Sequence, residues 1–410
     1  MARGAVASIY TAPKADSTNE QGRNQGLNVL FIGSDEFAGG ILAGLLKHVR
    51  GQGSVINNLE VACARPKIRV GMASSGSVGR VPVETAALIS KLRVHYTPTG
   101  QLYDWVVPRP KADPEAVFDI GVACTSSSIL PKRAVDAFPL GVLQIHPSLL
   151  PRHRGPTAIQ AAILGEDQET GVTVAEYSAE KRDSGRILAQ VPYKLDETST
   201  YREVQTALAH LGGKLIVKVL QHLDHVRSQA IPQDEDKASY TEAYEGDSHL
   251  KIVWETMTAA ELSRMCRAFH GIQALHTIWR VENRMEKLQL LDLHLPARMV
   301  PPLNPMLGTR PPGSMFYAKK VPYLEVPCID DNRIHVSRLL VEGKTEKLAL
   351  EFVNGYLRET GMQRMLTKPV SQQKPTPDFV YPPGHRLFER SLALSAKRER
   401  RKRGPPAAKR

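Results

Sequence analysis

The sequence is poor in cysteine and has no long apolar run. Its four cysteines, in 410 residues, lie more than 60 positions apart and form no C-x-x-C pair. This spacing argues against a disulfide framework and against a zinc site, and it favours a reducing compartment. The apolar stretches all fall short of the roughly 18 to 20 residues that a membrane-spanning helix needs. We therefore expect neither a metal site nor a membrane partner.

Three common catalytic motifs are also missing. There is no G-x-G-x-x-G after the first apolar run, no G-x-x-x-x-G-K-[ST] and no G-x-S-x-G. These absences disfavour dinucleotide oxidoreduction, P-loop phosphoryl transfer and serine hydrolysis at a nucleophile elbow. In an enzyme of this sequence, the attacking group would come from a substrate.

The net charge of +12 is concentrated at one end of the chain. Eight basic residues and one acid fall within 391–410, which includes KRERRKR at 397–403. A run of this kind is usually solvated, and it also suits contact with the phosphates of RNA or DNA. The sequence leaves both interpretations of this tail open.

The length indicates more than one domain. A chain of 410 residues exceeds what a single hydrophobic core usually fills. Hydrophobic residues make up 42% and charged residues 23%, which is typical of globular proteins. The predicted divisions are a flexible N-terminal segment with candidate targeting function at 1–26, a catalytic domain at 27–225, a linker at 226–250, a second domain at 251–370, and a Pro-containing, basic tail at 371–410.

Short apolar runs alternate with helix-like stretches in the first of these domains. The runs read as buried strands and lie at 28–33, 59–64, 118–124, 141–145 and 171–177. Strands that alternate with helices predict an α/β fold with a mostly parallel, doubly wound sheet.

Two helices of this domain have clear end signals. The first is predicted at 156–164, with Pro156 at its first position and Gly165 ending it in the left-handed conformation. The second is predicted at about 200–224, with Thr200 as its N-cap.

Beyond the predicted linker, the pattern changes to one helix followed by short strands. These elements are predicted at 258–269 for the helix, at 288–294, 314–319, 323–329 and 333–341 for the strands, and near 346–357 for a last helix. Short strands at this spacing predict a small barrel or sandwich.

The densest group of polar residues lies in 141–188. Gln144 and His146 are two positions apart at the end of a predicted strand, so their side chains project to the same side. Open α/β sheets bind ligands at the carboxyl ends of their strands. Asp183, in a loop after the next strand, can orient the imidazole. Structural roles for His146 and Asp183 are the alternative, because lone histidines are often structural and aspartates often form caps and turns.

The stretch SLLPRHRGPTAIQAAILGEDQETGVTV, together with DSG at 183–185, closely resembles the methionyl-tRNA formyltransferase family. Further similar segments lie at 28–42, 81–98, 129–141, 252–269 and 339–357. Members of this family transfer the formyl group of 10-formyltetrahydrofolate to the amino group of initiator methionyl-tRNA. The resemblance implies a Rossmann-like formyltransferase domain followed by a smaller, OB-like β-barrel domain that binds tRNA.

The resemblance also implies a role for each matching residue. Gln144 and His146 would stabilise the oxyanion of a tetrahedral intermediate. Asp183 would hold His146 in its useful protonation state and help to remove the amine proton. The folate site would be lined by Ile129, Leu130, Pro131, Ser148, Leu149, Leu150 and Pro151.

A basic, Gly-rich segment at 65–80 stands where the family inserts a loop into the acceptor stem. Arginine and lysine neutralise phosphates without reading bases. The implied RNA contacts are Arg65, Lys67, Arg69 and Arg80. The alternative is a mobile surface loop without a ligand.

Gln144 departs from the family, which has Asn at this position. The extra methylene moves the amide by about an ångström, and a displacement of that order can cost on the order of a hundredfold in rate. Formyl transfer to methionyl-tRNA remains the favoured hypothesis. The alternatives are a folate-dependent formyltransferase that acts on a small amine and a tRNA-binding homologue with impaired catalysis.

The predicted location is the mitochondrial matrix, with the cytoplasm as the alternative. Gln144, the Pro-rich stretch at 295–313 and the basic tail look like the organellar type of this family. Residues 1–26 contain Asp16 and Glu20, which a presequence usually lacks. We expect a monomer.

Overall fold

The computed structural model describes residues 26–65, 81–98, 102–111, 113–124, 129–244, 246, 248–281, 284–296, 310–317, 321–357 and 365–366. The chain forms two compact units. One is built from Met1–Ala162 and Gln168–Ala243, and the other from Ile163–Asp167 and Tyr244–Arg410. Within the described ranges, no helix has the length and apolar character that crossing a bilayer requires.

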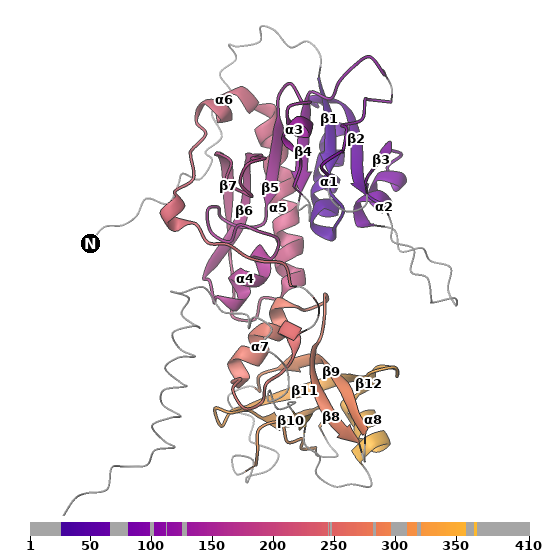
Figure 1. Ribbon diagram of the computed structural model, residues 1–410, viewed down its shortest axis with the longest axis vertical. Helices are drawn as coiled ribbons and strands as arrows, with labels where there is room; N and C mark the ends of the chain where they lie inside the picture. The colour runs from indigo at the N-terminus through magenta and orange to yellow at the C-terminus, as the bar shows by residue number, and fades with distance from the viewer. Residues whose placement is uncertain are drawn as a thin grey trace, which may run out of the picture. The chain divides into compact units, whose positions relative to one another are not determined.

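The first unit is organised around a seven-stranded sheet with the order β3-β2-β1-β4-β5-β6-β7 (Figure 1). The neighbouring strands from β3 to β5 are parallel, whereas β6 is antiparallel to both β5 and β7. The prediction of a mostly parallel sheet is therefore confirmed. The strands are β1 Leu27–Ile32, β2 Ile56–Ala64, β3 Val94–Thr97, β4 Ile120–Cys124, β5 Val142–His146, β6 Glu169–Glu176 and β7 Ile187–Lys194.

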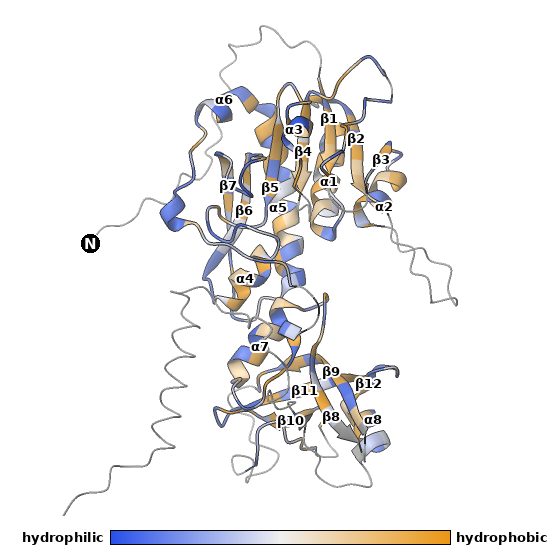
Figure 2. Ribbon diagram, in the orientation of Figure 1, coloured by the Kyte–Doolittle hydropathy of each residue, from blue (hydrophilic) through white to orange (hydrophobic). Residues whose placement is uncertain are grey.

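Strand β7 was not predicted from the sequence. Only Ala189 of its eight residues is buried, and it includes Pro192. It lies at the end of the sheet order, where proline is tolerated because no further strand needs its N–H. The inner strands are different: β4 and β5 are buried at every position. Figure 2 shows β1, β2 and β4 in the colour of hydrophobic residues, as expected for strands covered on both faces.

Helices cover this sheet, and their ends follow from local chemistry. They are α1 Glu36–Val49, α2 Pro82–Ile89, α3 Lys132–Val135, α4 Ala158–Leu164, α5 Tyr201–Gln221 and α6 Leu223–Ser228. The predicted N-cap Thr200 is confirmed, since it forms a capping box with Glu203 at the start of α5. Helix α1 packs on α5 at small residues: a Cβ on Gly44 would lie 2.7 Å from the Cα of Gly213.

The end signals predicted for the helix at 156–164 were wrong in detail. Pro156 lies in a turn before the helix, which begins at Ala158. The left-handed residue after the helix is Glu166, with φ 56°, and not Gly165. The preceding loop is held by tertiary hydrogen bonds, which delay the start of the helix by two residues.

The segment that we predicted as a linker packs on the first unit over much of its length. Ile231 pairs with Ile187 through two backbone hydrogen bonds of 2.8 and 2.9 Å. Residues 233–242 then run along the loop that follows β5, with a short 3-10 helix, η1, at Glu235–Lys237. The polar composition of this segment therefore reflects hydrogen bonding to the first unit.

The second unit is built on a six-stranded sheet with the order β10-β11-β9-β8-β13, in which β12 pairs with β11. All pairings between these strands are antiparallel. Its elements are the 3-10 helix η2 Ser248–Leu250, α7 Ala259–Ala268, β8 Leu275–Val281, β9 Arg284–His294, β10 Leu324–Pro327, β11 Arg333–Val341, β12 Lys347–Leu348, α8 Ala349–Phe352, the π-helix η4 Val353–Leu357 and β13 Met365–Leu366.

The predicted strands at 288–294, 323–329 and 333–341 and the helix at 258–269 are confirmed. The predicted strand at 314–319 is reduced to single bridge residues at Ser314 and Phe316, the latter paired with Glu325, and its last two residues lie outside the described part. Strand β8 was not predicted. Its Trp279 is fully buried and lies 5.0 Å from the ring centre of Phe352, so tertiary packing stabilises it.

Candidate active site

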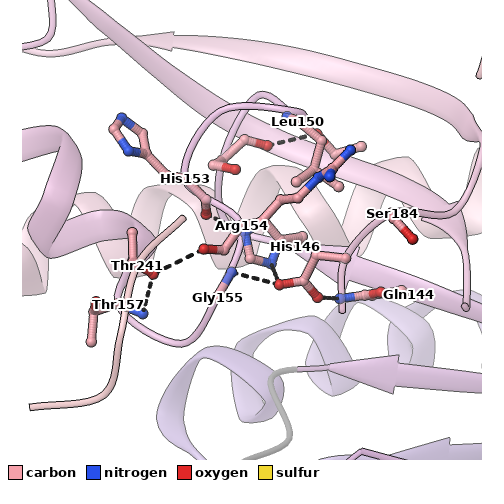
Figure 3. Close-up of polar contacts among 12 residues, drawn as sticks. Gln144, His146, Leu150, His153, Arg154, Gly155, Thr157, Ser184 and Thr241 are labelled. Atoms are coloured by element: carbon pink, nitrogen blue, oxygen red, sulfur yellow. Dashed lines mark hydrogen bonds and ion pairs between the residues drawn. The ribbon is translucent and has the colours of Figure 1, made fainter. Parts of the chain in front are cut away.

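Gln144 and His146 lie toward the carboxyl end of β5 (Figure 3), and Asp183 lies beside both of them. The Gln144 Nε2 donates a hydrogen bond to Asp183 Oδ1. The His146 Nδ1 lies 3.8 Å from Asp183 Oδ2. Because both β5 residues reach the same carboxylate, they project to one side of the sheet, as their spacing predicted. All three are at least 91% buried, which strengthens the electrostatic interactions among them.

Two backbone groups of the loop after β5 complete this cluster. The amide of Gly155 donates to Asp183 Oδ2 over 2.6 Å, and the carbonyl oxygen of His153 lies 2.9 Å from His146 Nε2. Gly155 has a φ of 112°, and a Cβ there would lie 2.1 Å from the carbonyl oxygen of Thr241. A glycine is therefore required at this position, both for its conformation and for the close approach.

Asp183 is held in an uncommon backbone conformation, with φ 56°. Aspartate tolerates the left-handed region better than most residues. The loop between β6 and β7 is pinned by Gln233, whose Nε2 donates to the carbonyl oxygens of Asp183 and Gly185 over 2.8 and 2.7 Å. Hydrogen bonds to both the side chain and the backbone of Asp183 thus orient its carboxylate.

The S-L-L-P stretch is anchored in the fold. Ser148 is fully buried, its Oγ donates to the Arg152 carbonyl oxygen over 2.6 Å, and its carbonyl oxygen accepts a 2.6 Å bond from Thr173. Leu150 is 3% exposed, and the Leu150–Pro151 peptide is cis. Leu149 packs against Gly171 of the neighbouring strand. The side chains of this stretch therefore mostly pack in the interior, where they stabilise the loop.

The other predicted folate-site residues lie just before α3. Leu130 is fully buried and Ile129 is 46% exposed. The backbone N–H of Leu130 donates to the hydroxyl oxygen of Tyr177 over 2.8 Å. Burial raises the pKa of Tyr177, and the nearby charge of Asp183 raises it further, so this phenol stays protonated at neutral pH. Ile129, with its exposed side chain, is the member of this set most accessible to a ligand.

Of the four predicted RNA contacts, only Arg65 lies within the described residues. It is exposed directly after β2, and its guanidinium carbon lies 5.3 Å from the centre of the Tyr96 ring. Lys67, Arg69 and Arg80 lie outside the described part of the chain.

A cavity of about 380 Å³ opens elsewhere in the first unit. Trp105, Arg109 and Phe118 are in its lining, and Gln144, His146 and Asp183 are not. Phe118 precedes β4, so the cavity lies toward the amino ends of the parallel strands, away from the ligand-binding edge of such sheets. Among the described residues, no group of three or more His, Cys, Asp or Glu is placed to hold a metal ion.

Comparison with known proteins identifies the family. The "Formyl transferase" family model matches residues 112–220. The human "Methionyl-tRNA formyltransferase, mitochondrial" is 31% identical over 330 residues, which cover 80% of this chain and 77% of the human protein. This chain belongs to the methionyl-tRNA formyltransferase family. The bacterial methionyl-tRNA formyltransferase of Ehrlichia ruminantium (strain Gardel) is 33% identical over 246 residues, or 60% of this chain and 74% of that protein.

A solved structure shares the fold. HypX from Aquifex aeolicus, crystallised in complex with tetrahydrofolic acid, matches with a TM-score of 0.51 at 15% identity. The match covers 82% of this chain and about half, 48%, of the HypX chain. The family resemblance deduced from the S-L-L-P stretch and D-S-G is therefore confirmed by the family match, and the Rossmann-like formyltransferase fold is confirmed with it.

The groups that hold the cluster of Gln144, His146 and Asp183 in place were not predicted from the sequence. The Gly155 amide and the His153 carbonyl are backbone groups, which a search for side-chain chemistry does not find. Gln233 lies in the segment that we took for a linker. The R-G pair at 154–155 was the available signal, because a glycine directly after a buried arginine marks a backbone that must approach another closely.

Proposed function

We propose that this chain transfers the formyl group of 10-formyltetrahydrofolate to the amino group of initiator methionyl-tRNA. The observation that carries the proposal is the convergence of Gln144, His146 and Asp183 at the carboxyl end of β5 in a member of this family. An amide, an imidazole and a carboxylate supply a hydrogen-bond donor, a proton carrier and a negative charge, as acyl transfer to an amine requires.

The reaction proceeds by addition and elimination. The neutral methionyl amine attacks the formyl carbon, a C–N bond forms, and the formyl oxygen becomes an oxyanion. The intermediate then collapses, the bond from the formyl carbon to N10 of the folate breaks, and N10 takes up the proton that the amine has lost. An α-amino group has a pKa of about 7.7 to 8.0, so a substantial fraction is neutral at physiological pH.

Each residue of the cluster has a part in these steps. An amide side chain has two N–H donors; one of Gln144 holds Asp183, and the other stabilises the oxyanion. Such a donor is typically worth about 2.7 to 4 kcal/mol. His146 carries the proton from the amine to the leaving nitrogen. Asp183 stabilises the imidazolium that forms in between.

The substrates would be held on both sides of this cluster. Ile129 forms the exposed part of one wall for the pterin ring, supported by Leu130 and Pro131, and Ser148, Leu149, Leu150 and Pro151 shape the loop on the other side. The basic segment that begins at Arg65 and includes Lys67, Arg69 and Arg80 contacts the acceptor stem through its phosphates. The second unit, for which we propose an OB-like barrel, supplies a further RNA surface.

The deciding experiment follows a labelled formyl group. Purified full-length protein is incubated with 10-formyltetrahydrofolate labelled at the formyl carbon and with methionyl initiator tRNA, and label in the tRNA fraction is counted. We expect turnover that depends on the methionyl group, so uncharged tRNA is the control. Absence of transfer under conditions in which a known formyltransferase works would exclude the proposal.

Two alternatives are separated by the same assay. A formyltransferase for small amines would label an amino sugar nucleotide or glycinamide ribonucleotide and leave methionyl-tRNA unlabelled. A homologue with impaired catalysis would bind tRNA in a salt-sensitive manner without turnover, and Gln144→Asn would restore transfer. The hydrogen bond from Gln144 to Asp183 favours the active enzyme, because it gives the glutamine a place in the cluster.

For location and assembly, we propose a monomer in the mitochondrial matrix. The support is the similarity to the human protein that is named as mitochondrial. Fluorescence imaging of a C-terminal fusion tests the location, and light scattering of the purified protein tests the assembly state. A cytoplasmic signal or a dimeric mass would correct these two points without affecting the reaction.

A further inference from the structure

Residues 233–242, which we call the strap, lie against the loop that carries two of the backbone partners of the active-site cluster. The loop residue Arg154 is the centre of this contact. Its guanidinium is fully buried and donates to the side chains of Gln233, Glu235 and Tyr240 over 2.7 to 3.1 Å. A buried charge is costly unless it is paired and hydrogen-bonded, so the strap is needed to keep Arg154 where it is.

The strap also holds the backbone on both sides of Arg154. The N–H of Arg154 donates to the carbonyl oxygen of Ser239 over 2.8 Å, and the N–H of Thr241 donates to the carbonyl oxygen of Arg154 over 2.6 Å. The Ser239 Oγ accepts a 2.8 Å hydrogen bond from the N–H of His153. Figure 3 shows a further contact, in which the Thr241 hydroxyl donates to the carbonyl oxygen of Arg154 over 3.2 Å. The positions of the His153 carbonyl and the Gly155 amide therefore depend on the strap.

Gln233 connects the strap to the other side of the cluster. Its Nε2 donates to the carbonyl oxygens of Asp183 and Gly185, while its Oε1 accepts from Arg154. One side chain thus ties the loop after β5 to the loop that carries the catalytic carboxylate.

The carbonyl of His153 determines which nitrogen of His146 carries the proton. A carbonyl oxygen accepts and never donates, so the Nε2 that lies 2.9 Å from it must be the protonated nitrogen. In a neutral ring this leaves Nδ1 with its lone pair on the side of Asp183 Oδ2, 3.8 Å away.

We propose that the strap holds His146 in the Nε2–H tautomer, so that Nδ1 is the atom that accepts the amine proton and returns it to N10 of the folate. Gln233, Ser239 and Arg154 are then positioning residues for the transfer. The catalytic part of this inference rests on the proposed function, whereas the tautomer is a property of the protein alone.

The tautomer is measured first, without substrate. The full-length protein is labelled with ¹⁵N in its histidine rings, and spectra are recorded at increasing pH until the ring signals no longer change. The His146 signals are assigned by their loss in His146→Gln. We expect the proton on Nε2 and the deprotonated shift on Nδ1. A proton on Nδ1 in the wild type overturns the proposal.

The strap is then changed with Gln233→Glu. Glutamate keeps an acceptor for Arg154 but directs an oxygen instead of an N–H at the carbonyls of Asp183 and Gly185. We expect a mixed tautomer at His146 and a kcat on the order of 10- to 100-fold lower, with KM values for folate and tRNA within about twofold. Asp136→Asn is the matched control: Asp136 pairs with the exposed Lys132 of α3, outside the strap, and its replacement should change neither measurement.

A second variant keeps the test decisive if Gln233→Glu does not fold. Ser239→Ala removes the side-chain acceptor of the His153 N–H and should shift the tautomer in the same direction. If either variant, folded by circular dichroism, retains both the wild-type tautomer and the wild-type kcat, the strap has only a structural role. A wild-type chain that shows the Nε2–H tautomer but transfers no formyl group would instead refute the proposed function. It would leave the proposed effect of the strap on the tautomer unaffected.

Discussion

Each unit of this protein buries a histidine beside a carboxylate, and the two pairs differ in what surrounds them. In the first unit, His146 Nδ1 lies 3.8 Å from Asp183 Oδ2. In the second, His335 Nε2 lies 3.3 Å from Glu325 Oε2. Glu325 and His335 face each other on the adjacent antiparallel strands β10 and β11, whereas Asp183 reaches His146 from a separate loop.

Further charged and aromatic side chains surround the second pair. Arg333 Nε lies 2.9 Å from Glu325 Oε2, the Tyr323 ring stacks on His335 with a centroid distance of 3.7 Å, and the His294 ring lies at 5.6 Å. Burial lowers the pKa of His335, although Glu325 opposes the shift. This pair is held by side chains within a sheet, so we assign it to stability.

The comparison shows that a buried histidine and carboxylate do not by themselves identify a catalytic site. The first pair is distinguished by its place at the carboxyl end of a parallel strand and by its backbone partners at His153 and Gly155. Three measurements test this assignment, and a fourth tests the predicted RNA contact.

The largest expected effect is the loss of transfer in His146→Ala. Removal of a general acid and base typically costs 10²- to 10⁴-fold in rate, and we expect a fall of about this size in kcat with little change in the melting temperature. The matched variant is His335→Gln in the second pair, which should lower the melting temperature and leave kcat within about threefold. A catalytic loss in His335→Gln that equals the loss in His146→Ala would remove the distinction between the pairs.

Gln144→Asn should have the next largest effect. The shorter side chain withdraws the amide from Asp183 by about an ångström, and we expect kcat to fall by about 100-fold. Steady-state kinetics with methionyl-tRNA measure the change. A rise in kcat would show instead that glutamine impairs this site, as the hypothesis of an impaired homologue requires.

A smaller effect is expected in the stability of the second pair. As the pH falls below 6.5, the unfolded chain protonates His335 while the folded chain, with its lowered pKa, does not. The free energy of unfolding should therefore decrease from pH 7 to pH 5. Urea unfolding followed by tryptophan fluorescence measures it, since Trp254 and Trp279 both lie in the second unit. The decrease should be weaker in His335→Gln, and an equal decrease would contradict the assignment.

The smallest effect concerns an exposed charge. Arg65→Ala should weaken tRNA binding by only about threefold and reduce the slope of log K against log salt by about 1, as expected for one lost phosphate contact. Arg133→Ala is the control, because Arg133 is already paired with Asp104 at 3.2 Å. Binding is measured by filter retention at several salt concentrations, and the slope of Arg133→Ala should equal that of the wild type. An equal slope for Arg65→Ala would exclude the phosphate contact.

Much of the fold follows from local pattern. Continuous apolar runs predicted β1, β2, β4, β5 and β6, because strands covered on both faces must be apolar throughout. The capping residue Thr200 predicted the start of α5, where it forms a capping box. Thr258 forms a second capping box at the start of α7, which was not predicted. Strands β7 and β8 were not predicted, because only one residue of β7 is buried and β8 packs on residues distant in the sequence, such as Phe352.

The sequence alone determined the family, the polar residues at the end of β5 and the shared side of Gln144 and His146, since these depend on residue identity and on the two-residue period of a strand. The family resemblance already implied that Asp183 acts with His146. Tertiary structure alone decided that Gly155 and His153 hold the carboxylate and the imidazole, and that a supposed linker packs over Arg154. The reason is physical. Hydrogen bonds between backbone groups far apart in the chain depend on how the loops fold together, and no local pattern of side chains specifies them.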